Sequence, residues 1–313
     1  MIRAMFSVAM LCSATASAGS GPWVVGEGNG TIYSGLESQR LTNLAITVDD
    51  ERLVIPVGEG LSTFGVKAIG AWGLTNRIEI EGEVPWYRVH ANRSDSQLCA
   101  DLGLRACATT KSIGLIRLSG KYLVFDELLG APVSVSIGGE ARFGDFTEDT
   151  RARITNVGEG TFDLGTWLSV GRTGALGSIG SYSVYTDLGY RYRFAKTTTF
   201  PNFTGNLRVP GSEYEARIAS LVSPNPYFGV GPAVNVLWRP RGLDWGEVDL
   251  TDPDRLSALR VFNLRAGGQV ILRSRGGISV SASAFGTVWT VNNPSDVFVV
   301  SLGAQVPIAL KDR

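Results

Sequence analysis

The chain's single histidine precedes residue types that a serine hydrolase uses. His90 is followed by Ser94, Asp95 and Ser96, and a serine activated by a histidine that an aspartate orients is a nucleophile. Phospholipases built on membrane barrels place histidine and serine two residues apart on one strand face, a spacing that does not occur here. We therefore favour an exposed polar residue at a strand end as the interpretation of His90 over a hydrolase centre.

The cysteines favour a structural bridge rather than redox chemistry. Cys99 and Cys107 lie within one polar stretch, whereas Cys12 lies in an apolar N-terminal run. A CxxC spacing is absent. In an exported chain, we therefore predict a disulfide between Cys99 and Cys107 that closes a small loop. Such a bridge would stabilise the fold by about 2–3 kcal/mol. One histidine and so few cysteines leave little material for a metal site, and we expect neither metal nor cofactor.

Charged residues of both signs alternate with apolar ones, so they can act together only where extended strands put them on one surface. Glu79, Glu81 and Glu83 share one side of a strand and would stand beside Arg117 and Lys121 on the next. Such groups can form ion pairs between neighbouring strands or can line a water-filled channel, and both interpretations stay open. The candidate lumen-lining residues are Glu79, Glu81, Glu83, Arg117, Lys121, Asp187, Arg191, Arg193, Arg217 and Arg265.

A period of two runs through nearly the whole chain from residue 29 onward, and it places alternate side chains on opposite faces of strands. A soluble strand averages about five or six residues and a tilted membrane-spanning strand needs about nine to eleven; most segments here reach the longer length. We predict an all-β fold, a transmembrane antiparallel up-and-down β-barrel of about twelve strands. The predicted strands are residues 30–38, 61–73, 77–89, 112–125, 132–141, 160–171, 181–195, 213–222, 227–238, 258–272, 277–289 and 297–309.

The connections alternate between short turns and longer polar loops. The predicted turns are 74–76, 126–131, 172–180, 223–226 and 273–276, and the predicted loops are 39–60, 90–111, 142–159, 196–212, 239–257 and 290–296. Outer-membrane barrels have this arrangement, with both termini in the periplasm. Aromatic residues cluster near strand ends, among them Trp72 and Trp167 toward the turns and Trp238 and Trp289 toward the loops. This placement predicts two interfacial girdles.

The composition excludes several classes of protein. The 313 residues carry 29 basic and 29 acidic side chains and are 44% hydrophobic. No basic excess is present to neutralise a nucleic-acid backbone, so a nucleic-acid partner is not expected. Beyond the N-terminal run, no stretch approaches the roughly 18 consecutive apolar residues that indicate a membrane-spanning helix.

The N-terminus has the pattern of a secretory signal peptide. Arg3 precedes a short apolar run, and Ala16-Ser17-Ala18 fits the small-x-small cleavage site. We expect a signal peptide at residues 1–18 and export of the protein. Residues 19–28, which are rich in glycine and contain Trp23, would hang in the periplasm or fold back as a plug. Residues 29–310 would form the barrel.

The segment AWGLTNRIEI at residues 71–80 resembles a bacterial outer-membrane family that carries the label meta-pathway of phenol degradation, or simply transporter. Further matching segments are Val84-Pro85-Trp86 and residues 187–191, 227–232 and 291–294. The resemblance covers roughly residues 29–310 and implies an outer-membrane barrel that passes small, hydrophobic or aromatic compounds. The shared motifs are turns and strands, so no catalytic residue is carried over.

The sequence is consistent with three functions. We expect most of all a barrel that passes small molecules by passive diffusion or facilitated uptake, without catalysis. The alternative is a structural or adhesive barrel whose extracellular loops, including the loop with Cys99 and Cys107, bind a ligand. A barrel hydrolase is the least favoured. The expected location is the cell outer membrane, and the expected partners are outer-membrane lipid, small solutes and the barrel-assembly machinery.

Overall fold

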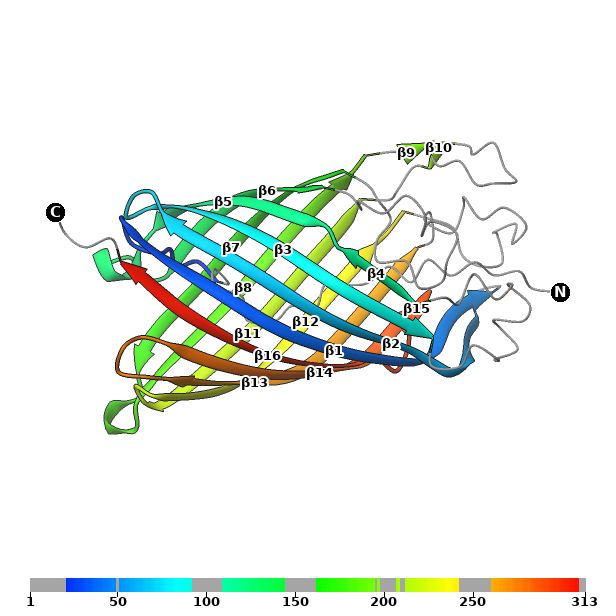
Figure 1. Cartoon of the computed structure of the whole chain (residues 1–313). Coiled ribbons are helices and arrows are strands. Elements are labelled where there is room, and N and C mark those ends of the chain that lie inside the picture. Colours follow the sequence, from blue (N-terminus) through cyan, green and yellow to red (C-terminus); the bar gives the residue numbers. More distant parts are fainter. Residues whose placement is uncertain are drawn as a thin grey trace.

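The computed structural model describes residues 21–48, 51–91, 109–143, 162–194, 196–197, 207–208, 212–241 and 260–309. Within these ranges twelve long antiparallel strands form one wall (Figure 1). They are β1 (Asn29–Val48), β2 (Glu51–Gly73), β3 (Ile78–Ala91), β5 (Ile116–Phe125), β6 (Ser134–Phe143), β7 (Asp163–Ala175), β8 (Ser181–Arg193), β11 (Glu213–Asn225), β12 (Phe228–Arg239), β13 (Val261–Arg273), β14 (Ser279–Val291) and β16 (Phe298–Ala309).

The wall closes into a barrel because β1 pairs with strands from both ends of the sequence. Ser34 on β1 is opposite Ala68 on β2 and also opposite Ala304 on β16. Each of the other wall strands pairs with the wall strands that precede and follow it in the sequence. Closure leaves none of the twelve wall strands at an open edge of the sheet. The predicted antiparallel barrel of about twelve strands is confirmed.

Short connections gather at one end of the barrel, which we call the turn end; the other is the loop end. The turn end lies at the left in Figure 1, where β16 also finishes. Two of its connections contain single turns of 3-10 helix, η2 (Glu127–Leu129) and η4 (Gly177–Ile179). Asp126 caps η2 by accepting a hydrogen bond from the Leu128 N–H at 2.9 Å. Gly130 ends η2 with a φ of 96°, a conformation that glycine adopts without strain.

Within residues 39–60, predicted as a loop, residues 39–48 and 51–60 instead belong to β1 and β2 and continue the pairing of these strands at the loop end. The ladder continues from Leu41 opposite Leu61 to Val48 opposite Glu51, with an irregularity between Leu41 and Asn43. Asp296 anchors this irregularity because its carboxylate accepts the backbone N–H groups of Thr42 and Asn43, at 3.0 and 2.7 Å. The prediction was wrong because it followed local polarity, whereas these residues continue the backbone ladder between β1 and β2.

Four short strands complete the described sheet structure. The predicted strand 112–125 is divided into β4 (Thr110–Ile113) and β5, because the chain leaves the ladder at Gly114. The Gly114 N–H still donates to the Pro85 carbonyl oxygen at 2.9 Å, so the break is local. The remaining short strands are β15 (Asn293–Pro294), which pairs with β1, and the ribbon of β9 (Lys196–Thr197) and β10 (Leu207–Arg208).

The outer surface of the barrel is apolar and the inner face carries the buried polar groups. On β8, Val184, Leu188 and Tyr192 are exposed, whereas Tyr185 and Arg193 on the opposite face are buried. This is the reverse of a soluble sheet, in which exposed faces are polar. A closed barrel with an apolar outer face is the structure that spans a bilayer with strands. In the described residues, none of the helical turns is long or apolar enough to be a membrane-spanning helix.

Aromatic side chains form a belt on the outer surface at the loop end. Tyr190, Tyr214 and Trp238 are successive neighbours from β8 to β12, with ring centroids 5.3 and 5.5 Å apart. Such a belt suits the headgroup level of a bilayer. Trp167, predicted for the girdle at the turns, instead lies mid-strand on the β7 face that carries Asp163 and Ser169. Its place differs because β7 extends further toward the turn than the sequence indicated.

Candidate functional site: the barrel interior

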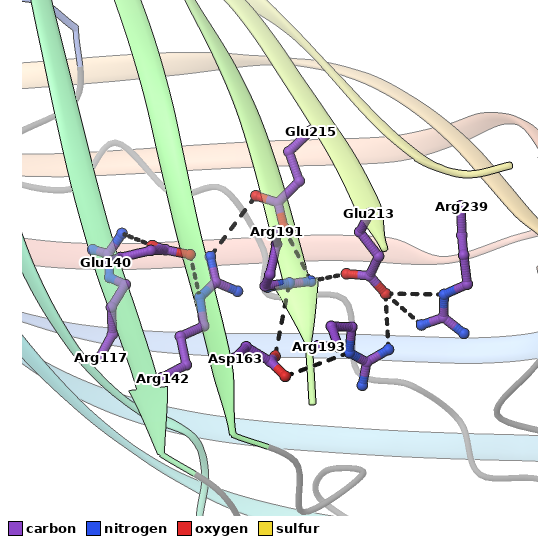
Figure 2. Close-up of polar contacts among 9 residues, drawn as sticks. All are labelled: Arg117, Glu140, Arg142, Asp163, Arg191, Arg193, Glu213, Glu215 and Arg239. Atoms are coloured by element: carbon purple, nitrogen blue, oxygen red, sulfur yellow. Dashed lines mark hydrogen bonds and ion pairs between the residues drawn. The ribbon is translucent and has the colours of Figure 1, made fainter. Parts of the chain in front are cut away.

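Ionised side chains of alternating sign run across the inner face from β5 to β12. Arg142 on β6 contacts Glu140 at 2.7 Å, and Arg191 on β8 contacts Glu215 on β11 at 3.1 Å. Figure 2 shows these residues in one continuous row of ion pairs. We call the row the ion-pair network; its members are Arg117, Glu140, Arg142, Asp163, Arg191, Arg193, Glu213, Glu215 and Arg239.

Glu213 is the centre of this network at the loop end of β11. Its carboxylate pairs with Arg191, with Arg193 at 3.0 Å and with Arg239, whose Nε donates to it at 3.2 Å. Asp163 on β7 contacts the guanidinium groups of Arg191 and Arg193 from the other side, at 3.8 and 3.7 Å. The side chains of Glu213 and Asp163 are almost fully buried. These contacts therefore tie β7, β8, β11 and β12 together across the interior.

The register of β3 and β5 brings together five of the predicted lumen residues. Glu79 is opposite Lys121 and Glu83 is opposite Arg117. The Lys121 ammonium lies 3.1 Å from Glu79, and the Arg117 guanidinium lies 2.9 Å from Glu83 and also pairs with Glu81. Arg117 lies 3.7 Å from Glu140, so this group joins the ion-pair network. The predicted cross-pairing between neighbouring strands therefore accounts for these five side chains.

The other predicted lumen residues are distributed over three strands. Arg191 and Arg193 belong to the ion-pair network. Asp187 accepts a hydrogen bond from the Ser169 hydroxyl at 2.6 Å. The Arg217 guanidinium lies over the Tyr185 ring, 5.5 Å from its centroid. Arg265 is buried on β13.

The wall from β12 to β16 has a different inner face, made largely of amide, hydroxyl and small side chains. Asn235, Asn263, Gln269 and Ser301 each have a buried polar atom without a hydrogen-bond partner among the described residues. Buried polar groups are normally satisfied, by protein or by water. Buried atoms without a hydrogen-bond partner in the described residues also occur among the arginine side chains of the ion-pair network, so what distinguishes this wall is its neutral, small side chains.

Residues 21–28, which precede β1, contact inner side chains at the turn end. The Lys121 ammonium donates to the Trp23 carbonyl oxygen at 2.6 Å, and the Val25 N–H donates to Glu79 at 2.6 Å. The Gly28 N–H donates to the Gly73 carbonyl oxygen at 3.1 Å, and Asp187 accepts the Gly21 N–H. The buried pair of Glu79 and Lys121 therefore serves two purposes, since it links β3 to β5 and holds this segment.

Several sequence predictions lie outside the described residues. They are the signal peptide at 1–18, the disulfide of Cys99 and Cys107, and the serines and aspartate proposed as partners of His90. His90 itself is exposed at the loop end of β3, and its Nδ1 lies 2.7 Å from the Thr109 hydroxyl. Across the described part of the chain, no three His, Cys, Asp or Glu side chains are grouped as metal ligands.

The aromatic residues of the inner face and one arginine of the ion-pair network were not predicted from the sequence. Tyr33, Tyr185 and Phe285 are buried there. Phe285 follows Ser281 and Ser283 at a period of two, a signal that was present in the sequence. Arg239 was missed because the predicted strand ended one residue earlier, although Asn235 and Leu237 continue its face.

The fold is that of the outer-membrane β-barrel proteins. A crystal structure of an outer-membrane channel from Pseudomonas putida F1 superposes with a TM-score of 0.66 and 12% identity, over 94% of this chain and 100% of that chain. The NanC porin gives 0.48 and 7%, over 90% and 100%. The translocator domain of the autotransporter NalP from Neisseria meningitidis gives 0.45 and 13%, over 90% and 89%. No family model and no curated protein matches the sequence.

Proposed function

We propose that the protein is an outer-membrane channel that passes small molecules through the barrel without transforming them. The observation that carries this proposal is the distribution of side chains on the closed wall, with apolar groups outside and ionised or amide groups inside. The likeness to the Pseudomonas putida channel over the whole of that structure supports it. The turn end would face the periplasm, as in other barrels of this kind.

The route would follow the inner face from β12 to β16. The ion-pair network occupies the wall from β5 to β12, whereas the inner face along the route carries mainly neutral amides and hydroxyls. Side chains on this face are also small, since Gly231, Gly267 and Ser283 lie on it. The family resemblance implies hydrophobic or aromatic compounds as the solutes, and amide groups can bind the hydroxyl or amine that such compounds carry.

Liposome swelling with uncharged solutes of graded size and polarity tests the proposal. We expect vesicles that contain the purified protein to admit small solutes and to exclude larger ones above a sharp limit. Discrete conductance steps in planar bilayers should accompany this permeability. Vesicles that stay sealed to every solute, with no conductance steps, would contradict a channel.

Narrowing the proposed route should reduce its conductance. Ser301 lies on the inner face of β16 and Ala304 on the outer face of the same strand. We expect Ser301→Trp to lower single-channel conductance about twofold or more, because pore diameter limits conduction. Ala304→Trp places the same ring in the outer surface and should leave conductance unchanged. Equal conductance in both variants would place the route elsewhere.

A further inference from the structure

The Trp23 indole occupies a defined site on the inner face of the barrel. Its ring lies edge-on to the Tyr185 ring, with centroids 6.0 Å apart and an interplanar angle of 85°. It packs on a buried cluster that Tyr185 forms with Ala219, Ala233 and Phe285. We call these four residues the ring site. They come from β8, β11, β12 and β14, so the ring site borders the wall along which the proposed route runs.

The polar N–H of the Trp23 indole also has a hydrogen-bond partner. The Trp23 Nε1–H donates to the Glu127 carboxylate at 3.1 Å, at the turn end of the barrel. The Thr173 backbone N–H and hydroxyl donate to the same carboxylate, at 2.9 and 2.7 Å. Burial acts to raise the pKa of Glu127, but these hydrogen bonds outweigh it and hold the pKa below its ordinary value. The carboxylate is therefore charged and available to an N–H or O–H donor.

The ring site combines two small side chains with two aromatic ones, a composition that suits contact with a planar ring. Ala219 and Ala233 have small side chains, and the Arg217 guanidinium lies over the Tyr185 ring, 5.5 Å from its centroid. Aromatic rings in edge-to-face contact gain about 0.5–1.5 kcal/mol beyond their buried area. Two other buried clusters, Tyr33 with Ile69 and Tyr87 with Val89, also lie inside the barrel, but among the described residues only the ring site is packed against the Trp23 side chain.

We propose that residues 21–28 are a tethered plug and that the ring site binds an aromatic ring from solution in competition with Trp23. This inference rests on the proposed channel function. A tethered side chain has an effective concentration in the millimolar range, so a free ring must be abundant or bind more tightly to replace it. The class of ligand is a planar ring with one N–H or O–H donor, which would take the place of the indole at Glu127.

Removing the Trp23 side chain tests the competition. We expect Trp23→Ala to raise single-channel conductance at least about twofold. Indole should bind the variant about tenfold or more tightly than the wild type, measured by isothermal titration calorimetry, because the internal competitor is gone. Cyclohexanol, which has a similar size but no aromatic ring, should show no such gain. Trp86→Ala, which removes an outer-face tryptophan, is the control and should match the wild type in every measurement.

A second variant dislodges the plug while keeping Trp23. A Cβ at Gly73 would overlap the carbonyl oxygens of Val25 and Gly26. We expect Gly73→Ala to reproduce the higher conductance and the tighter indole binding. If Trp23→Ala fails to fold, the Gly73 variant tests the proposal in its place. Wild-type conductance and wild-type indole affinity in the folded variants would overturn the proposal. A barrel that binds indole more tightly after either change but never conducts would keep the ring site and refute the channel.

Discussion

Replacement of Glu213 by glutamine is expected to destabilise the barrel by about 3–5 kcal/mol, because removing one partner of a buried ion pair leaves charge uncompensated. Arg191, Arg193 and Arg239 would lose the carboxylate that they share. Glutamine keeps the size of the side chain, so the loss reports on charge rather than packing. Urea unfolding of the protein in lipid vesicles, followed by tryptophan fluorescence, measures the change.

Glu215 provides the matched control for Glu213. The two residues lie on the same face of β11, but the Glu215 side chain is 42% exposed. We expect Glu215→Gln to destabilise by about 1 kcal/mol or less, since exposed ion pairs contribute little. If both variants lost the same free energy of unfolding, burial would not determine how much an ion pair of the network stabilises the barrel. The Glu213 variant should also shift ion selectivity toward anions, because it adds net positive charge to the interior.

Leu188→Arg is expected to destabilise the membrane-inserted barrel by about 2–4 kcal/mol, the usual effect of arginine on the lipid face at the bilayer midplane. Leu188 lies in the middle of β8 and is 50% exposed on the outer face. Its side chain would meet hydrocarbon, where a guanidinium finds neither water nor a counter-ion. The measurement is reversible unfolding from vesicles of defined lipid.

Leu128→Arg is the control for this prediction. Leu128 is 83% exposed, but it lies in η2 at the turn end rather than in the middle of a strand. There the same arginine should change stability by about 1 kcal/mol or less, since the effect of charge falls toward the interface. If both variants were equally stable, the outer surface of β8 would not be in contact with hydrocarbon.

The wall could be predicted from the sequence because its signal is local and repeats. In β3, the alternation of Glu79, Glu81 and Glu83 with apolar residues indicates both the strand and the face that each side chain occupies. Chain order then places β5 beside β3, so the neighbourhood of Arg117 and Lys121 to these carboxylates follows without knowledge of the exact register. For neighbouring antiparallel strands, proximity in the sequence predicts contact in space.

The remaining features depend on contacts between distant parts of the chain. Residues 21–28 have no periodicity, and their position depends on Lys121 and Glu79, which lie on other strands. The irregularity in the first hairpin is held by Asp296 near the C-terminus. The ring site was missed for another reason: we expected hydrophilic side chains on the inner face, and Tyr185 and Phe285 share that face through the same period of two.

The pairing of β1 with β16 has a consequence for how the barrel is assembled. This ladder joins Asn29 to Ala309, so it closes the longest loop in the molecule and should be among the last contacts to form. Until it forms, an intermediate has two open edges whose N–H and C=O groups hydrocarbon cannot satisfy. We therefore expect sealing of the seam and entry into the bilayer to occur together, with the open form retained at the membrane surface.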